Sequence, residues 1–399
     1  MSDFNYLKGF RRLLERTEVP ERFAVWSGIA SLLAALERRI YINQGIYTIY
    51  PNFYMVLVAA SGQKKSTAIN TAAKLLRKLN PAPNIVSQKI TPEALVSALK
   101  VVGNDSTKVM KESCGGIVIA DELATFLDRN SLEKGLGPML TELYDCKAYE
   151  YQTKSRGIER LEDGYLSLLG GTTVELIKNC LPKDAIGGGF TSRTIFIYEE
   201  AQPAPVAWID YDEELAQLEQ ELVNYLQRVM ELEGPVEVSK PAKDFFIADY
   251  EARHRVGEFR NDPLLRSYEN RRHAHLLKVA MAIMVSEEPR RVLDPYHIMA
   301  AKTILEEAEA YMPRVVELIA ATDTGMAGSL VMNYIDARLH AGSDFVMRRD
   351  IVRHFAHKFD SQEISKFLDT LIKADRIKID TVGGQLVYRK LAADKRIMI

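Results

Sequence analysis

Residues 61–67, Ser-Gly-Gln-Lys-Lys-Ser-Thr, combine the side chains that proteins use to hold a polyphosphate. Seven mostly apolar, β-prone residues, 53–59, precede them, and the helical pattern AINTAAKLLRKL follows. A strand that enters a helix through a tight loop presents free backbone N–H groups and a positive dipole end to an anion. A lysine then reaches the outer phosphates and a hydroxyl holds Mg²⁺. The residues that we expect to bind ATP in this way are Ser61, Gly62, Gln63, Lys64, Lys65, Ser66 and Thr67.

This stretch departs from the usual phosphate-loop pattern G-x-x-x-x-G-K-[ST] at both glycines. Lys65 and Ser66 match the last two positions, whereas Ala59 replaces the first glycine and Lys64 replaces the second. On these residues alone, the alternative is a buried strand that runs into an amphipathic helix with a solvated lysine pair. A partner motif must decide between the two interpretations.

The segment CGGIVIADELATFL, residues 114–127, supplies such a partner because its apolar strand ends at Asp121 and Glu122. In a phosphate-loop enzyme the aspartate holds the Mg²⁺ shell and the glutamate polarises the attacking water. We therefore predict Ser66 and Asp121 as metal residues and Glu122 as a catalytic residue. A strand that ends in a solvated acidic turn is the alternative. Since 55 positions separate Ser66 from Asp121, in the expected order and on the expected elements, the two motifs together favour an ATPase.

Two later stretches add candidate catalytic residues to Lys65 and Glu122. The strand pattern YLSLLGGTT ends in Thr172 and Thr173, either of which could sense a γ-phosphate. The glycine-rich stretch 185–193 ends in Arg193, which could stabilise phosphoryl-transfer charge on its own subunit or across a subunit boundary. A plain turn and a surface ion pair are the respective alternatives.

Four of these motifs, taken together, resemble a known family. SGQKKST, IVIADELATFL, LLGGTT and GGFTSR are similar, in this order, to the uncharacterised family of RecA-like P-loop ATPases of phages and mobile elements, which is related to the hexameric replicative helicases. VWSGIASLLAALERRIYI and RRHAHLLKVAMAIM resemble it too, so the likeness covers residues 20–310. In that family the last glycine of the phosphate loop is often a basic residue, as Lys64 is here. The resemblance implies an ATP-driven motor or switch in DNA replication and does not establish translocation.

The composition is that of a globular chain of two or three domains, with 399 residues, 47% of them hydrophobic and 27% charged. With a net charge of −2, the chain as a whole has no strong electrostatic field that would attract nucleic acid or a membrane. Cys114, Cys146 and Cys180 form neither a disulfide framework nor a metal pattern, which fits a reducing cytoplasm. The longest apolar run, Phe23–Leu36, is too short to span a bilayer, so we expect a cytoplasmic protein with no membrane partner.

The remaining elements follow from periodicity and turn residues. Residues 1–40 predict two helices, and the alternating Ile/Tyr pattern of residues 38–52 predicts a β-hairpin that turns at Asn43-Gln44-Gly45. Thr91 is a predicted N-cap. Residues 213–312 are helical in pattern. There, Arg271, Arg272 and His273 could touch a nucleotide from a helical lid, and a solvated face is the alternative.

The C-terminal residues predict a separate winged helix, because three helical patterns precede two alternating strands joined by Gly383-Gly384. Asp360 and Glu363 have the spacing of a capping box. From residue 327 onward, 13 Lys and Arg stand against 9 Asp and Glu, so this part carries +4 while the remainder carries −6. The asymmetry favours DNA. Glu363 and Asp369 would repel phosphates, however, so a protein-docking module is the alternative.

We therefore expect an α/β protein with a RecA-like or AAA+-like P-loop NTPase core, a helical domain and a C-terminal winged helix. The expected parts are an N-terminal helical segment (1–45), a P-loop ATPase core (46–205), a helical domain (206–325) and a winged-helix domain (326–399).

The leading hypothesis is an ATP-hydrolysing homo-oligomer, expected as a hexameric ring, that acts as a DNA helicase or translocase in phage or mobile-element replication. ATP and Mg²⁺ are the expected cofactors. Single-stranded or forked DNA is the expected partner, and a primase or another replication protein is a further one. The alternative is a replication initiator or helicase loader that uses ATP as a switch. A third hypothesis is a non-catalytic scaffold, since both glycines of the phosphate loop are replaced.

Overall fold

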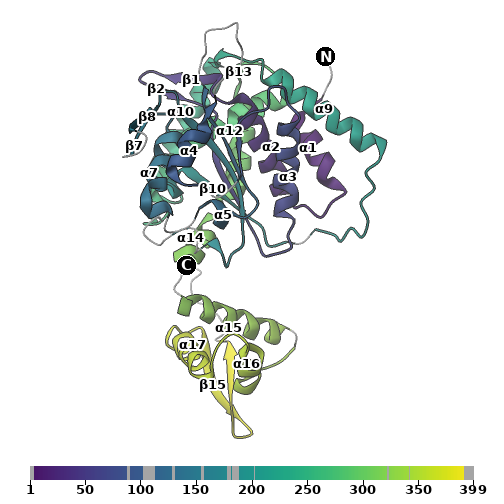
Figure 1. Ribbon diagram of the computed structural model, residues 1–399. Coiled ribbons are helices and arrows are strands. Elements are labelled where there is room, and N and C mark those ends of the chain that lie inside the picture. The colour runs from purple at the N-terminus through teal and green to yellow at the C-terminus, as the bar shows by residue number, and fades with distance from the viewer. Residues whose placement is uncertain are drawn as a thin grey trace. The chain divides into compact units, whose positions relative to one another are not determined.

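Five strands form the central sheet of the larger unit in this computed structural model (Figure 1). They are β3 (Tyr54–Val58), β4 (Ile85–Val86), β6 (Ser113–Ala120), β9 (Tyr165–Thr172) and β10 (Thr194–Tyr198). Their order is β10-β3-β9-β6-β4, and every neighbouring pair is parallel. Every residue of β3, β9 and β10 is buried, which explains their nearly continuous apolar sequences. A short β5 (Lys100–Val101) pairs antiparallel with β6.

The chain divides into two compact units, Met1–Ile319 and Ala320–Ile399. The larger unit includes the expected N-terminal segment and core together with most of the expected helical domain. The structure describes residues 4–87, 90–101, 113–127, 131–153, 157–177, 181, 188–201, 203–320, 323–340 and 342–390. Cys180 and residues 185–187 of the glycine-rich stretch lie outside these ranges.

Helices cover both faces of the sheet (Figure 1). One side holds α1 (Tyr6–Glu15), α2 (Glu21–Leu36), α3 (Lys65–Arg77) and α9 (Glu213–Val229). The other side holds α4 (Pro92–Leu99) and α7 (Gly137–Tyr144). The helix α2 is buried along nearly its whole length, as its apolar sequence requires. The two predicted N-terminal helices are therefore confirmed, and so is Thr91 as the N-cap of α4.

Short elements connect these layers. The predicted hairpin is confirmed as β1 (Ile40–Gln44) and β2 (Tyr47–Ile49), with a left-handed Gly45 in its turn. The other short strands are β7 (Tyr149–Thr153), β8 (Gly157–Leu161), β11 (Gly234–Pro235), β12 (Glu237–Val238) and β13 (Val292–Leu293). The other short helical turns are α5 (Leu123–Phe126), η1 (Leu132–Leu136) and η3 (Thr191–Arg193).

The predicted helical pattern after residue 213 is also confirmed. It forms α9 and then α10 (Lys240–Val256), α11 (Arg266–Glu269), α12 (Arg272–Glu287), α13 (Pro295–Glu309) and α14 (Met312–Ala320). The helix α12 packs against α2 and α13 and is almost entirely buried. It therefore belongs to the same hydrophobic core as the sheet.

The smaller unit has its own hydrophobic core. Its elements are α15 (Asp323–His340), β14 (Val346–Met347), α16 (Arg348–Phe355), α17 (Ser361–Lys373), β15 (Ile377–Val382) and β16 (Gln385–Lys390). The capping box of Asp360 and Glu363 is confirmed, and Gly383 and Gly384 both have the positive φ of a two-residue hairpin turn. The strand β14, which was not predicted, completes an antiparallel sheet of order β14-β16-β15. Two residues are too few to show alternation in a sequence.

A buried lysine ties α12 to the amino edge of the central sheet, where β3 begins. Lys278 Nζ donates to the backbone oxygen of Asn52 at 2.7 Å and to Asn52 Oδ1 at 2.8 Å. Asn52 Nδ2 in turn donates to the backbone oxygens of Tyr144 at 2.9 Å and Leu166 at 3.2 Å. One polar network therefore joins α12, the start of β3, the end of α7 and β9.

We expect the buried charge of Lys278 to make the free energy of unfolding depend on pH, and the Lys278→Met variant to lack this dependence. Burial lowers the pKa of Lys278 to about 8, whereas an unfolded lysine titrates near 10.5. Below about pH 8 the charged, buried amine destabilises the folded state. As pH rises from about 8 to about 10.5, the folded state loses this proton before the unfolded state does, and stability increases. Relative to Lys278→Met, the wild-type free energy of unfolding should rise by about 2 kcal/mol between about pH 7.5 and about pH 9.5, measured by urea denaturation. A difference that stays constant with pH would contradict this.

Candidate functional site

The loop of residues 59–64 connects β3 to α3, and two of its residues have left-handed backbone conformations. Gly62 has a φ of 87°, and Lys64 has a φ of 51° with a ψ of 22°. Glycine adopts this region freely, whereas a residue with a side chain does so at a cost of about 1–2 kcal/mol. Lys64 stands where the phosphate-loop pattern has its second glycine. The backbone therefore keeps a conformation that glycine favours, although the side chain differs. Lys64 Nζ forms an ion pair with Glu18 Oε2 at 2.9 Å.

The first turn of α3 is open to a ligand. No side chain caps its N-terminus, and no acidic residue lies in its first turn. By contrast, side chains cap α4, α9 and α10. Ser61, Gly62, Ser66 and Thr67 are exposed around this turn. Free N–H groups and the positive dipole end therefore face solvent where an anion could bind.

Lys65, the first residue of α3, folds back over the loop. Its Nζ donates to the backbone oxygens of Ala59 at 3.0 Å and Ala60 at 2.8 Å, and its side chain is largely buried. Burial lowers the pKa of Lys65, while the negative charges of Glu122 and Glu175 act in the opposite direction. The ammonium group therefore lies within electrostatic reach of two carboxylates, one of them the predicted catalytic Glu122.

Gln63 connects the loop to the neighbouring strand. Its Nε2 donates to the backbone oxygen of Glu200, just after β10, at 3.2 Å. Its Oε1 is buried and has no hydrogen-bond partner among the described residues. A buried amide oxygen without a donor is costly, and a bound ligand or water is one explanation for such a group.

The two predicted acids lie at the same edge of the sheet as the loop. Asp121 and Glu122 directly follow β6, which is separated from β3 only by β9. Asn70 Nδ2 donates to Asp121 Oδ2 at 2.9 Å. Because Asn70 lies four residues after Ser66 on α3, both project from one helix face, and that face is turned toward Asp121. Glu122 Oε1 is buried and has no hydrogen-bond partner among the described residues.

Thr172 is the last residue of β9, which lies between β3 and β6 in the sheet. Its side chain is fully buried, and its backbone oxygen accepts from the N–H of Ala59 at 3.3 Å. The hydroxyl of Thr173 instead accepts from the N–H of Leu176 and begins a turn. Of the two threonines left open by the sequence, Thr172 is therefore the one joined directly to the loop.

Arg193 lies at the opposite edge of the sheet. It precedes Thr194, which pairs with Tyr54 at the start of β3, whereas the loop follows the end of β3. Its side chain is buried, and Nε and Nη2 donate to both carboxylate oxygens of Asp145 while Nη1 donates to the backbone oxygen of Gly189. A contact with the phosphates of its own subunit is therefore wrong, because parallel strands begin and end at opposite edges. A contact across a subunit boundary would require the guanidinium to leave Asp145.

Four residues of these sites were not identified from the sequence. Only Asn70 had a signal there, since it follows the predicted metal residue Ser66 by one helical turn. The partners of Lys64, Lys65 and Arg193 are distant in sequence, and the tertiary fold alone brings them close. They are Glu18, Glu175 and Asp145.

Comparisons with known proteins do not assign the chain. No protein-family model matches it, and no curated protein is similar to it. None of the described helices has both the length and the apolarity needed to cross a bilayer. In the described part of the chain, no three His, Cys, Asp or Glu side chains cluster as metal ligands. The functional argument therefore depends on the geometry of the site.

The residues near the loop fit a magnesium ion that arrives with its nucleotide. Mg²⁺ binds oxygen ligands and commonly uses one or two protein groups, with phosphates and waters supplying the rest. The hydroxyl of Ser66 is exposed and the carboxylate of Asp121 faces the same side of α3. These two oxygens suit Mg²⁺ with a polyphosphate better than they suit a metal held by protein groups alone.

We expect Arg193→Gln to lower stability. Among the described residues, the change leaves Asp145 with only the 3.4 Å ion-pair contact to Arg271, and it removes the bond to Gly189. The free energy of unfolding should therefore fall by about 3 kcal/mol. The control is Arg255→Gln. Arg255 is exposed and, in the described part of the chain, pairs with Glu251 alone, so this change should alter the free energy of unfolding by less than about 0.5 kcal/mol. Urea denaturation measures both. Unchanged stability of Arg193→Gln, together with lost ATP turnover, would instead assign Arg193 to the reaction.

Proposed function

We propose that this chain is an ATP-hydrolysing, oligomeric DNA helicase or translocase with a RecA-like core. The observation that supports it best is the convergence of the loop and the acids. Lys65 lies near Glu122, and Asn70 on the Ser66 face of α3 contacts Asp121, although these motifs are more than fifty positions apart. The parallel sheet and the open N-terminus of α3 further support a phosphate-binding loop.

In this proposal each residue has a separate task. The backbone N–H groups of the loop and of the first turn of α3 hold the phosphates, and Lys65 exchanges its two loop carbonyls for the β- and γ-phosphate oxygens. Ser66 and Asp121 hold Mg²⁺, which supplies neutralisation of the phosphate charge when bound. Glu122 accepts a hydrogen bond from the attacking water, and Thr172 senses the γ-phosphate.

The unpaired oxygen of Glu122 supports its role as the water-orienting base. A carboxylate that is already satisfied by protein donors would have to break those bonds before it could accept from a water. Glu122 Oε1 has no such bond among the described residues, and the charge of Lys65 lies within electrostatic reach of Glu122. The arrangement therefore suits a group that acts on a substrate water.

The smaller unit supports a DNA partner through its topology and charge. A helix, a short strand, two helices and a hairpin follow one another, which is the arrangement expected of a winged helix. The exposed cations of α16, including Arg349 and Arg353, suit a phosphate backbone, whereas α17 carries Glu363 and Asp369. We propose that α16 contributes to DNA contact in this unit, and a protein-docking role is the alternative.

ATP turnover tests the assignment of the loop. Lys65→Ala should abolish Mg²⁺-dependent hydrolysis, and Glu122→Gln should reduce it by about a hundredfold or more while nucleotide still binds. Lys64→Ala should weaken turnover less than Lys65→Ala, and Lys64→Gly should retain turnover because glycine favours the left-handed backbone. Phosphate release measures the rates, and thermal melting checks folding. If Lys64→Ala were the more harmful change, the assignment of the loop would be off by one residue.

A helicase loader or initiator is the second candidate, because a nucleotide core and a winged helix suit an ATP switch equally well. A forked DNA duplex separates the two. A motor should displace a strand in an ATP-dependent manner, and Glu122→Gln should abolish the displacement. Tight DNA binding without displacement would support the switch. Absence of Mg²⁺-dependent turnover in the wild-type protein would support the non-catalytic scaffold instead.

A further inference from the structure

Three cavities in the larger unit meet at His273, near the start of α12. Their volumes are about 80, 460 and 480 Å³, and His273 lines all three. Asn270 is shared by the first and third, and Arg271 by the second and third. Because they share these lining residues, we group the three cavities and call them the His273 groove. We define it by the side chains Tyr47, Tyr250, His254, Arg260, Arg271 and His273.

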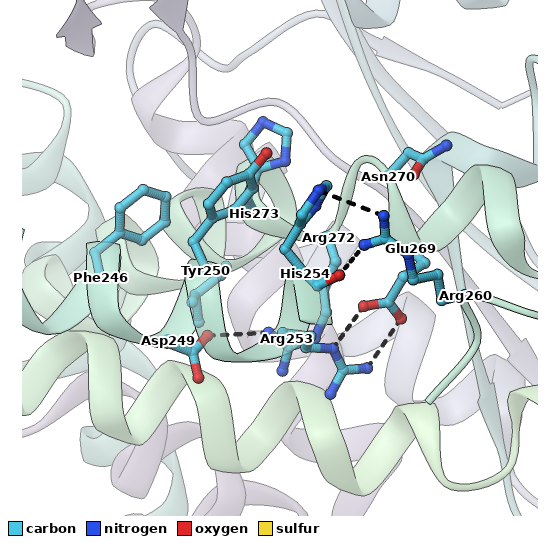
Figure 2. A pocket seen from close by; sticks show the side chains of 11 residues that line it. Phe246, Asp249, Tyr250, Arg253, His254, Arg260, Glu269, Asn270, Arg272 and His273 are labelled. Atoms are coloured by element: carbon cyan, nitrogen blue, oxygen red, sulfur yellow. Dashed lines mark hydrogen bonds and ion pairs between the residues drawn. The ribbon is translucent and has the colours of Figure 1, made fainter. Parts of the chain in front are cut away.

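Aromatic rings line one end of the groove (Figure 2). The ring of Tyr250 stacks on His254, with centroids 5.8 Å apart and planes at 22°, and His273 meets it edge-on at 5.5 Å. Tyr250 is 46% exposed although it belongs to this cluster. In the second cavity, Tyr47 on the β1–β2 hairpin is 66% exposed. Exposed flat rings of this kind can each stack on an unpaired base.

The cations of this region fall into two sets. Arg253 and Arg272 pair with Glu269, Glu309 and Asp249, as Figure 2 shows in part, so their charges are neutralised within the fold. Their role is structural.

Arg260 and Arg271 differ from that first set. Arg260 contacts only the backbone oxygen and ring of His254, and it has no carboxylate partner among the described residues. Arg271 shares the single carboxylate of Asp145 with Arg193, and the charge of the buried Lys278 lies close to the same carboxylate. Arg260 and Arg271 therefore have less carboxylate in direct contact than Arg253 and Arg272 have, which favours an anionic ligand at these two positions.

We propose that the His273 groove binds single-stranded nucleic acid, with phosphates at Arg260 and Arg271 and unstacked bases on the rings of Tyr250, His254 and Tyr47. Together the three cavities present exposed rings and two arginines that have little carboxylate in contact, which suits several nucleotides better than one. A duplex keeps its bases stacked on one another and offers no free faces to the rings. The inference deepens the DNA partner of the proposed function, and the binding itself needs no ATP.

The experiment uses the full chain without nucleotide and a fluorescent dT15 oligonucleotide, with binding followed by anisotropy across a salt series. Tyr250→Ala should weaken binding by about tenfold, and Tyr250→Phe should retain it, since stacking needs only the ring. Arg260→Ala should weaken binding and lower the salt dependence by about one phosphate contact.

Arg255→Ala is the matched control for charge. Arg255 lies on the same helix as Tyr250 and is exposed, and its one ion pair with a described residue is to Glu251. It lines none of the three cavities. It should leave dT15 affinity within about twofold of wild type at moderate salt. Thermal melting verifies that each variant is folded, so that a loss of binding reports on the groove.

Three results would overturn the inference. The first is an equal loss of dT15 affinity in Arg255→Ala and Arg260→Ala, and the second is an unchanged dT15 affinity in Tyr250→Ala. The third is competition by dTMP that is as strong per nucleotide as competition by unlabelled dT15, which would indicate a mononucleotide pocket. Lys65→Ala should bind dT15 like wild type. A protein that binds dT15 through the groove but hydrolyses no ATP would therefore refute the proposed function alone.

Discussion

Parallel pairing of β3 with β9, and of β9 with β6, is the constraint on which the candidate site depends. Because these strands run in the same direction, their carboxyl ends meet at one edge of the sheet. Val58 pairs with Thr172, and Ala120 pairs with Gly170. Two strand spacings amount to only about 10 Å, so residues from three distant segments lie around one small volume. A change of strand direction or order would separate the loop from the acids.

The carboxyl edge of the sheet contains groups that the fold leaves unsatisfied. The helix α3 lacks a side-chain cap, and the buried oxygens of Gln63 and Glu122 have no partners among the described residues. Stability alone would favour pairing each of them. At the amino edge, Lys278 and Arg193 are instead bound by Asn52 and Asp145. The unpaired oxygens and the uncapped helix support a ligand at the carboxyl edge, and the partners of Lys278 and Arg193 support a mainly structural role for those two cations.

Arginines near the start of α12 show how environment divides residues of one type. Arg272 and Arg253 are held by a cluster of carboxylates that joins α10, α12 and α13. Arg260 and Arg271 lie only a short distance away in sequence, yet the described structure gives them little compensating charge. The first pair stabilises the packing of helices, and the second pair is the one that we propose for contact with phosphate. Counting basic residues in the sequence would not separate them.

The sequence by itself determined the elements and the order of the motifs. Apolar runs, the Gly45 turn, the Thr91 cap, the Asp360 capping box and the Gly383-Gly384 hairpin are local signals, so the strands and helices that they predict are found near the expected residues. Lys65, Ser66, Asp121, Glu122 and Thr172 were identified because each stands directly at the end of a predicted strand or the start of a predicted helix.

Only the tertiary structure decided which edge of the sheet each residue occupies and which charges are compensated. The sequence shows that Arg193 precedes a strand but not at which edge that strand begins, so it could not decide between a contact with its own loop and one with a neighbouring subunit. The left-handed backbone of Lys64, the contact of Asn70 with Asp121 and the grouping of cavities around His273 join residues through space. Local residue patterns carry no information on such pairings, because strand order and helix packing are settled by the burial of the whole core.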